Sequence, residues 1–394
     1  MEGNNSSTGV TRRRFVATST AGLAYAGFSR PLNAFPFAGP QQRDLTIGNG
    51  VQRVIIDTDP GVDDAFALLL AMRSPELKIE AITTVAGNVP LDLTLPNALR
   101  MVEIAGRTDI AVAAGAKSPL MRRLVTATYA HGENGLGGAV FPEPTTKPAS
   151  EPAPDLIQQI VRKYPREVTL ITIGPQTNVA AALKADPEIA PLVRGLVMMG
   201  GSLSGGNITP AAEFNVYVDP EASRIVFQSG IPITMVGLDV TRKTALTDQH
   251  VATLGANKSR VSQAAAIIGR NAIAHNRAQA FLVGPNMHDS VAVAAFLDPS
   301  IIRTEQYYVD VETGGELTSG ETLGYSPTAG DLKRKPGASD PTSLNIPIRG
   351  SAPTLGSTRT SPVLRERFEA NTSVALDLDS RRFFDLLIGR LTSG

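Results

Sequence analysis

From residue 52 onward, the hydrophobic positions of this chain alternate between two kinds of pattern. Short runs of consecutive apolar and β-branched residues, bounded by Gly, Pro or Asn, are typical of strands buried on both faces of a sheet. Longer segments with apolar residues three and four positions apart predict helices. The strand-like runs are 54–56, 77–85, 110–114, 168–173, 195–199, 233–236 and 308–312, and the helix-like segments are 65–72, 91–105, 155–163, 179–184, 222–227, 263–280 and 290–296.

This alternation predicts an α/β fold: a single doubly wound, mainly parallel, Rossmann-like sheet with helices on both faces. No repeat of fixed period is evident, so we expect one domain over residues 50–394. Residues 326–371 are rich in Pro, Gly, Ser and Thr, which predicts a long surface insertion within that domain. After it, residues 374–391 return to a strand and an amphipathic closing helix.

The N-terminal segment, residues 1–42, differs in composition from the rest. A polar start is followed by Arg12-Arg13-Arg14-Phe15 and then by an uncharged, mildly apolar run to Phe28. That order is typical of an export signal, and the paired Arg before Phe indicates the twin-arginine class. The apolar run is too short to span a membrane. We therefore expect export to the periplasm and no membrane association after signal removal; the alternative is a disordered basic tail.

Composition excludes several classes of function. The 394 residues carry a formal net charge of +0, so no basic surplus marks a partner such as nucleic acid or an anionic membrane. The chain has no Cys and only four His, which disfavours a site for a soft metal and rules out disulfides.

The main chemical signal is a group of carboxylates directly after the first strand. Asp57, Asp59, Asp63 and Asp64 span the end of that strand, a Pro-Gly turn and the start of the following helix. In open α/β sheets, ligands bind at this edge. Because like charges repel, a hard divalent cation with oxygen ligands, calcium or magnesium, is the simplest explanation of the cluster. The alternative is that these residues only cap turns and the helix.

Other polar residues also follow apolar runs. Each alone is typical of a turn, but together they predict a site that hydrogen-bonds a polyhydroxylated ligand. They are Asn88, Asn178, Asn207, Glu213, Asn215, Asp239 and the pair His288-Asp289.

These motifs resemble the inosine-uridine-preferring nucleoside hydrolase family, from Val54 to the C-terminus. The most specific match is Asp57-Thr58-Asp59-Pro60-Gly61-Val62-Asp63-Asp64-Ala65. Supporting matches are 81–88 (AITTVAGN), 199–201 (MGG), 213–215 (EFN), 218–222 (VDPEA), 235–239 (MVGLD), His288-Asp289 and 308–312 (YVDVE).

The resemblance implies hydrolysis of the N-glycosidic bond of ribonucleosides to ribose and free base, by water that calcium activates. By similarity, the metal ligands are Asp59, Asp64, Asp289 and the main-chain carbonyl of Ile173. Asp59 is also implied to be the general base and His288 the general acid. The residues implied to bind substrate are Asp63, Asn88, Asn207, Glu213, Phe214 and Asn215, with His131 beside the base. A homo-oligomer, dimer or tetramer, is expected by analogy.

Two departures from relatives bear on the base. The chain has no Trp, which excludes stacking of a purine between Trp rings, and residues 276–285 contain no Tyr, with Phe281 their only aromatic residue. Base preference therefore stays open. The structural alternative for His288 is a capping or packing residue, and the alternative for His131 is an exposed loop residue. His250 and His275 receive no role.

Two other functions remain as alternatives. The first is an exported, calcium-dependent nucleoside- or ribose-binding protein without turnover. Such a protein would have no need of a catalytic general base beside the metal. The second is a metal-dependent phosphohydrolase, which would need Lys or Arg to hold phosphate, and the site loops contain almost none.

Overall fold

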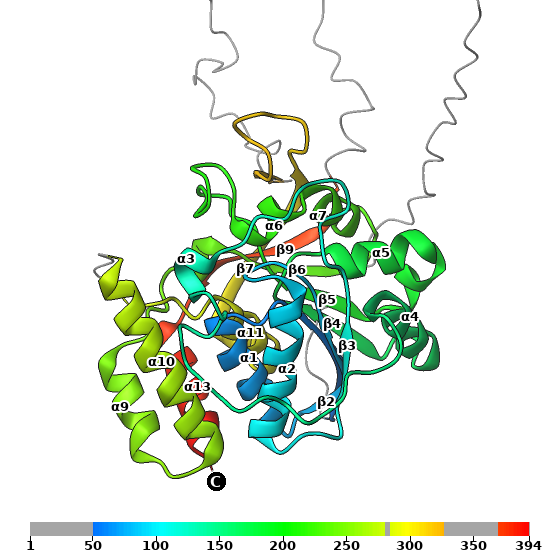
Figure 1. The fold of residues 1–394 in the computed structure, drawn as a ribbon. Coiled ribbons are helices and arrows are strands. Elements are labelled where there is room, and N and C mark those ends of the chain that lie inside the picture. The colour runs from blue at the N-terminus through cyan, green and yellow to red at the C-terminus, as the bar shows by residue number, and fades with distance from the viewer. Residues whose placement is uncertain (1–49, 280–283, 327–368, 394) are drawn as a thin grey trace, which may run out of the picture. The chain divides into compact units, whose positions relative to one another are not determined.

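The computed structural model describes residues 50–279, 284–326 and 369–393, all within the compact unit Ala38–Gly394 (Figure 1). The predicted export signal (1–42) and nearly all of the predicted insertion (326–371) lie outside the described residues, and so does Phe281.

The first half of the domain repeats a strand–helix unit. Strand β1 (Gln52–Thr58) is almost wholly buried, and Pro60-Gly61 ends it before α1 (Val62–Met72). The following elements are β2 (Leu77–Thr84), α2 (Leu91–Ala105), β3 (Ala111–Ala114), α3 (Thr128–His131), α4 (Ala153–Lys163), β4 (Val168–Thr172), α5 (Thr177–Ala185) and β5 (Gly195–Met199).

The second half departs from this regular alternation. Its elements are α6 (Phe214–Val218), α7 (Pro220–Phe227), β6 (Ile233–Val236), α8 (Leu238–Thr241), α9 (Asp248–Ala256), α10 (Arg260–Ala278), α11 (His288–Leu297), β7 (Ile302–Val311), β8 (Thr322–Tyr325), β9 (Thr372–Leu378) and α13 (Ser380–Thr392). The strand and closing helix predicted over 374–391 are thus β9 and α13.

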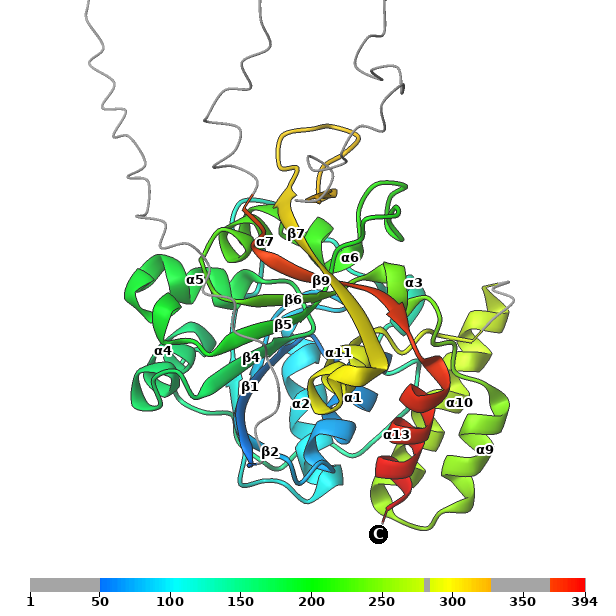
Figure 2. The same ribbon diagram turned by 180° about the vertical axis from the view of Figure 1, so that it is seen from behind.

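The sheet has the order β3-β2-β1-β4-β5-β6-β9-β7-β8 (Figure 2). The strands from β3 to β9 in this order are parallel, and β7 runs antiparallel to both of its neighbours. The chain builds outward from β1 in one direction and from β4 in the other, so β1 and β4 form a topological switch point. The prediction of a doubly wound, mainly parallel sheet is confirmed.

Helices cover both faces of the sheet, and each face has its own apolar core. Alternate residues of β1 point to opposite sides: Val54 and Ile56 belong to the core beneath α1, α2, α10, α11 and α13, whereas Ile55 belongs to the core beneath α4, α5 and α7. Among the described residues, no helix is both long enough and apolar enough to cross a membrane.

Several helices and strands were not predicted from the hydrophobic pattern of the sequence. Helices α3, α6 and α8 have four or five residues each, too few to show a helical period, and α9 buries only Val251 and Leu254. Strand β7 begins at Ile302, six residues before the predicted start, because its first half is largely exposed and carries no apolar run. Strand β8 pairs with β7 where no strand was predicted.

Candidate functional site

Asp64 is held at the start of α1 by a set of hydrogen bonds. Its Oδ1 accepts one from Thr58 Oγ1 at 2.7 Å, and its Oδ2 accepts from Gly61 N and Asn88 Nδ2, both at 2.9 Å. The residue is fully buried. It therefore does cap the helix, as the structural alternative supposed, but it also turns a fixed carboxylate toward the carboxyl ends of β1 and β2.

Asp59 is equally buried but only half satisfied. Its Oδ2 accepts a hydrogen bond from Asn88 N at 2.6 Å, whereas its Oδ1 has no partner among the described residues. Two glycines make room for it: a Cβ at Gly87 would lie 2.0 Å from Asp59 Oδ2, and one at Gly174 would lie 2.7 Å from Asp59 Oδ1. A buried carboxylate oxygen left without a donor is a position for a ligand or a proton.

Asp63 and Asp289 complete the acidic group. Asp289 lies in the first turn of α11, and one carboxylate oxygen each of Asp63, Asp64 and Asp289 lies within 4.8 Å of the others. Burial and the charge of Asp64 raise the pKa of Asp63 to about 7 and the pKa of Asp59 well above its usual range. Burial and the charge of Asp63 likewise raise the pKa of Asp289. Crowded, buried, all-oxygen donors of this kind fit a hard divalent cation.

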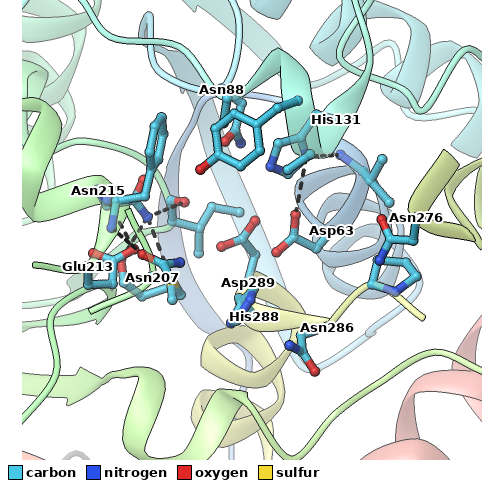
Figure 3. Close-up of a pocket in the computed structure, with 18 of the residues that line it drawn as sticks. Asp63, Asn88, His131, Asn207, Glu213, Asn215, Asn276, Asn286, His288 and Asp289 are labelled. Carbon is cyan, nitrogen blue, oxygen red and sulfur yellow. Dashed lines mark hydrogen bonds and ion pairs between the residues drawn. The ribbon is translucent and has the colours of Figure 1, made fainter. Parts of the chain in front are cut away.

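A cavity of about 280 Å³ opens above this acidic group (Figure 3). Asp63 and Asp289 point into its middle, with Asn207, Glu213 and Asn215 toward one end and His131, Asn276 and Asn286 toward the other. All the substrate-binding residues predicted from the sequence line it, namely Asp63, Asn88, His131, Asn207, Glu213, Phe214 and Asn215. Of the predicted metal ligands and catalytic residues, Ile173, His288 and Asp289 line it, and the buried Asp59 and Asp64 lie beneath it, next to Asn88.

The end of the cavity at Glu213 is rigid. Glu213 caps α6, and its carboxylate accepts hydrogen bonds from Asn215 N, Val216 N and Gly201 N at 3.0–3.1 Å. Burial raises the pKa of Glu213. Asn215 Nδ2 donates to the carbonyl oxygens of Ile173 and Met199, both at 3.2 Å. This end therefore offers a fixed carboxylate and fixed amides, which suit sugar hydroxyls.

His131 is fixed by the start of α1. Its Nδ1 lies 3.1 Å from Val62 N and therefore accepts that backbone hydrogen bond, which leaves Nε2 as the ring's donor. Burial lowers the pKa of His131 to about 4, so the ring is neutral near neutral pH. The 3.8 Å approach of Asp63 Oδ1 to Nδ1 is consequently a close contact rather than an ion pair.

His288, at the start of α11, is oriented by α8. Its Nδ1 lies 2.7 Å from Thr241 Oγ1. Burial lowers the pKa of His288 to about 3, so the ring is neutral near neutral pH and carries its hydrogen on one nitrogen only. The structure thus ties this residue to a named hydroxyl that the sequence did not indicate.

Some residues take places that sequence reasoning did not foresee. Tyr129, Asn276 and Asn286 also line the cavity, and the phenol comes from α3, not from the segment 276–285 where a Tyr was sought. His275, given no role, has its Nε2 2.8 Å from the carbonyl oxygen of Tyr129 and so connects α10 with α3. In the sequence, none of these residues belongs to a motif, and the only available signal was that Tyr129 and Asn286 lie close to predicted site residues.

Conversely, two of the polar residues grouped with the site in the sequence do not line the cavity. Asn178 donates from Nδ2 to Asp57 Oδ1 at 2.8 Å, and Asp239 Oδ2 accepts from Leu203 N at 2.9 Å. Both hold strand ends and loops in place below or beside the site. Asp57, the first carboxylate of the opening motif, belongs with this supporting layer.

Comparison with known proteins agrees with this geometry. The family described as inosine-uridine preferring nucleoside hydrolase matches residues 54–385. The pyrimidine-specific ribonucleoside hydrolase RihA of Enterobacter sp. (strain 638) is 45% identical over 271 residues, which span 68% of this chain and 87% of that protein.

Two solved structures are similar over most of their length. The plant nucleoside hydrolase PpNRh1 has a TM-score of 0.72 and 32% identity, covering 87% of this chain and 99% of its own. The purine-preferring ribonucleoside hydrolase from Gardnerella vaginalis has a TM-score of 0.72 and 31% identity, covering 86% and 98%.

Proposed function

Because the chain belongs to the inosine-uridine preferring nucleoside hydrolase family, we propose that it hydrolyses the N-glycosidic bond of ribonucleosides, giving ribose and a free base. The observation that carries this proposal is the placement of the buried carboxylates between an end of the cavity lined by Asn207, Glu213 and Asn215 and an end lined by His131, Asn276 and Asn286. A ribonucleoside has the same order of parts: hydroxyls, an anomeric carbon that becomes positive, and a base. The relatives' names include both pyrimidine-specific and purine-preferring enzymes. These names therefore do not indicate which base this protein prefers.

The cation we propose is calcium, held by Asp59, Asp64 and Asp289 and by the main-chain carbonyl of Ile173. All of these donors are oxygens, as calcium prefers, and Asp59 Oδ1 has no competing partner among the described residues. When bound, such a cation makes the attacking water more acidic and orients it. Asp63 shares the acidic group, and its position at the cavity surface suits a ribose hydroxyl as well.

The protein's own groups then account for the reaction. Asp59 accepts a proton as the water oxygen forms its bond to the anomeric carbon, and the surrounding carboxylates stabilise the positive charge that develops on the ribose. Asn207, Glu213 and Asn215 hold the ribose hydroxyls. As the bond from the anomeric carbon to the base nitrogen breaks, the base leaves with the bonding electron pair and takes up a proton, a transfer that we assign to His288, which regains the proton from solvent.

Thr241→Val should slow the release of poor leaving groups. The substitution keeps the side-chain shape but removes the hydroxyl that orients His288, so we expect kcat for nucleosides to fall about tenfold. A nitrophenyl riboside, whose leaving group needs no proton, should lose less than twofold. Steady-state kinetics on both substrates measure the difference. Thr253→Val, on the exposed side of α9, is the matched control, and an equal loss on both substrates would argue against this role for the hydroxyl.

The direct test of the proposed activity is release of free ribose from a panel of purine and pyrimidine ribonucleosides. Release from any member supports hydrolysis and shows which bases the cavity accepts. If none is cleaved while the protein binds calcium, the proposed activity is wrong, and binding without turnover becomes the better description.

We also propose that the protein is exported through the twin-arginine pathway. The support is the Arg12-Arg13-Arg14-Phe15 motif and the apolar run that follows it. Fractionation of cells that make the full chain should find the shortened protein in the periplasm; uncleaved protein confined to the cytoplasm would contradict export.

A homo-oligomer is a further proposal, which rests on analogy with the family alone. Light scattering on the purified protein would measure its mass, and a monomer at assay concentrations would refute it.

A further inference from the structure

We propose that Asn286 recognises the base of the substrate through its side-chain amide. This inference rests on the proposed nucleosidase function and extends it, because it assigns the base contact to a residue that no motif of the sequence marks. It also defines the substrate class: ribonucleosides whose base carries a hydrogen-bond donor and acceptor side by side.

The first observation is that the oxygen of this amide has no hydrogen-bond partner among the described residues. Asn286 Oδ1 is buried, yet it accepts no hydrogen bond from any described residue. Buried amide oxygens are nearly always paired in folded proteins, since leaving one unpaired is unfavourable. Asn286 also lines the cavity, so a ligand that enters the cavity can provide the missing donor.

The second observation is that the backbone around Asn286 is firmly held. Asn286 forms an antiparallel bridge with Ala245, and on either side Leu246 N donates to Pro285 O at 2.8 Å and Met287 N donates to Thr244 O at 3.0 Å. The unpaired amide is therefore not the result of an unanchored backbone. The fold presents it at a fixed point on the cavity wall.

The third observation is where that point lies. Asn286 is at the end of the cavity opposite Asn207, Glu213 and Asn215, with Asp289 between them (Figure 3). If the ribose hydroxyls occupy the end with the carboxylate of Glu213 and the anomeric carbon lies over the acidic group, the base must extend toward Asn286. His131 lies at the same end and contributes a second neutral donor.

The chemistry of the amide fits this position. One Asn side chain offers an acceptor and a donor in the same plane, which matches the adjoining N–H and C=O of an oxo base or, after rotation of the amide, the ring nitrogen and amino group of an amino base. Asn286 therefore favours bases with such an edge over leaving groups without one. Recognition by hydrogen bonding is open to a cavity without Trp, whereas the stacking of a base between Trp rings is not.

The test compares Asn286→Leu with the unsubstituted full chain on uridine, cytidine, inosine and a nitrophenyl riboside, in calcium. Leu has the same branched shape as Asn, although it is larger, and it cannot form hydrogen bonds. We expect kcat/KM to fall about 10- to 100-fold for the nucleosides that the protein cleaves, mainly through a higher KM, and less than threefold for the nitrophenyl riboside. Asn271→Leu, on the outer side of α10 where its amide donates to Ile267 O, is the matched control and should change neither.

Each other outcome overturns the proposal. Equal losses on nucleosides and the nitrophenyl riboside would mean that Asn286 only supports the fold, and no loss on any nucleoside would mean that the base does not contact it. If Asn286→Leu does not fold, Asn286→Ala, which removes the same amide and adds no bulk, takes its place with the same expectation. Cleavage of the nitrophenyl riboside but no nucleoside by the unsubstituted protein would refute base recognition alone, whereas cleavage of neither would refute the proposed function.

Discussion

Asp59→Asn is expected to lower kcat for nucleoside hydrolysis by about a thousandfold or more while the protein still folds. Asn can keep the hydrogen bond that Asp59 accepts from Asn88 N, so the loop after β2 should stay in place. It cannot accept a proton from water, and it removes a charge beside the anomeric carbon. Loss of a general base alone typically lowers a rate by about 10²–10⁴-fold, and loss of the charge adds to that.

Ribose release over hours, with thermal unfolding of the same samples, measures both parts of this expectation. Asp92→Asn, an exposed carboxylate on α2, is the control for the chemical change and should be fully active. A folded Asp59→Asn protein with more than a tenth of the normal kcat would remove Asp59 from the mechanism.

Removal of the cation is expected to have the second largest effect, on both activity and stability. A chelator should abolish turnover and lower Tm by several degrees, and added calcium should restore both. The reason is that burial and mutual repulsion both disfavour the charged carboxylates and raise the pKa values of Asp59, Asp63 and Asp289, and a bound cation offsets both effects. A cation at 100 times its Kd stabilises the folded state by about 2.7 kcal/mol.

Calorimetry with chelator and then with calcium or magnesium tests this prediction, and Asp289→Asn is the variant that links it to the site. In that variant the increase in Tm on adding calcium should be much smaller, because one ligand is lost. If the unsubstituted protein kept both its activity and its Tm in chelator, the assignment of these carboxylates to a metal would be wrong.

The fold was predictable because its strands are buried on both faces and therefore appear as uninterrupted apolar runs. The boundaries of β5 and β6 match the predicted ranges. The hydrophobic periodicity did not reveal elements that are stabilised by contacts with distant parts of the chain or by a capping side chain. Strand β8 forms by pairing with β7, and α6 is stabilised by the carboxylate of Glu213 at its N-terminus.

The site was partly predictable for a similar reason. Side chains after parallel strands converge at one edge, and most of the residues selected on that ground and by resemblance line one cavity or lie directly beneath it, whereas Asn178 and Asp239 do not line it. Their contacts could not be predicted. Thr241 reaches His288 only because α8 packs beside α11, and Asn286 gains its position from a bridge to Ala245 that leaves no trace in the sequence.

The distribution of the acidic group along the chain has a consequence for synthesis on the ribosome. Asp59, Asp63 and Asp64 are made near the start of the domain, whereas Asp289 is added only with α11, after most of the sheet has been translated. At about 5–20 residues per second, the early carboxylates wait for roughly ten seconds or longer for their last partner. A nascent chain released before α11 emerges would therefore lack part of the proposed cation site, and capture of the ion would report that α11 has packed against α1.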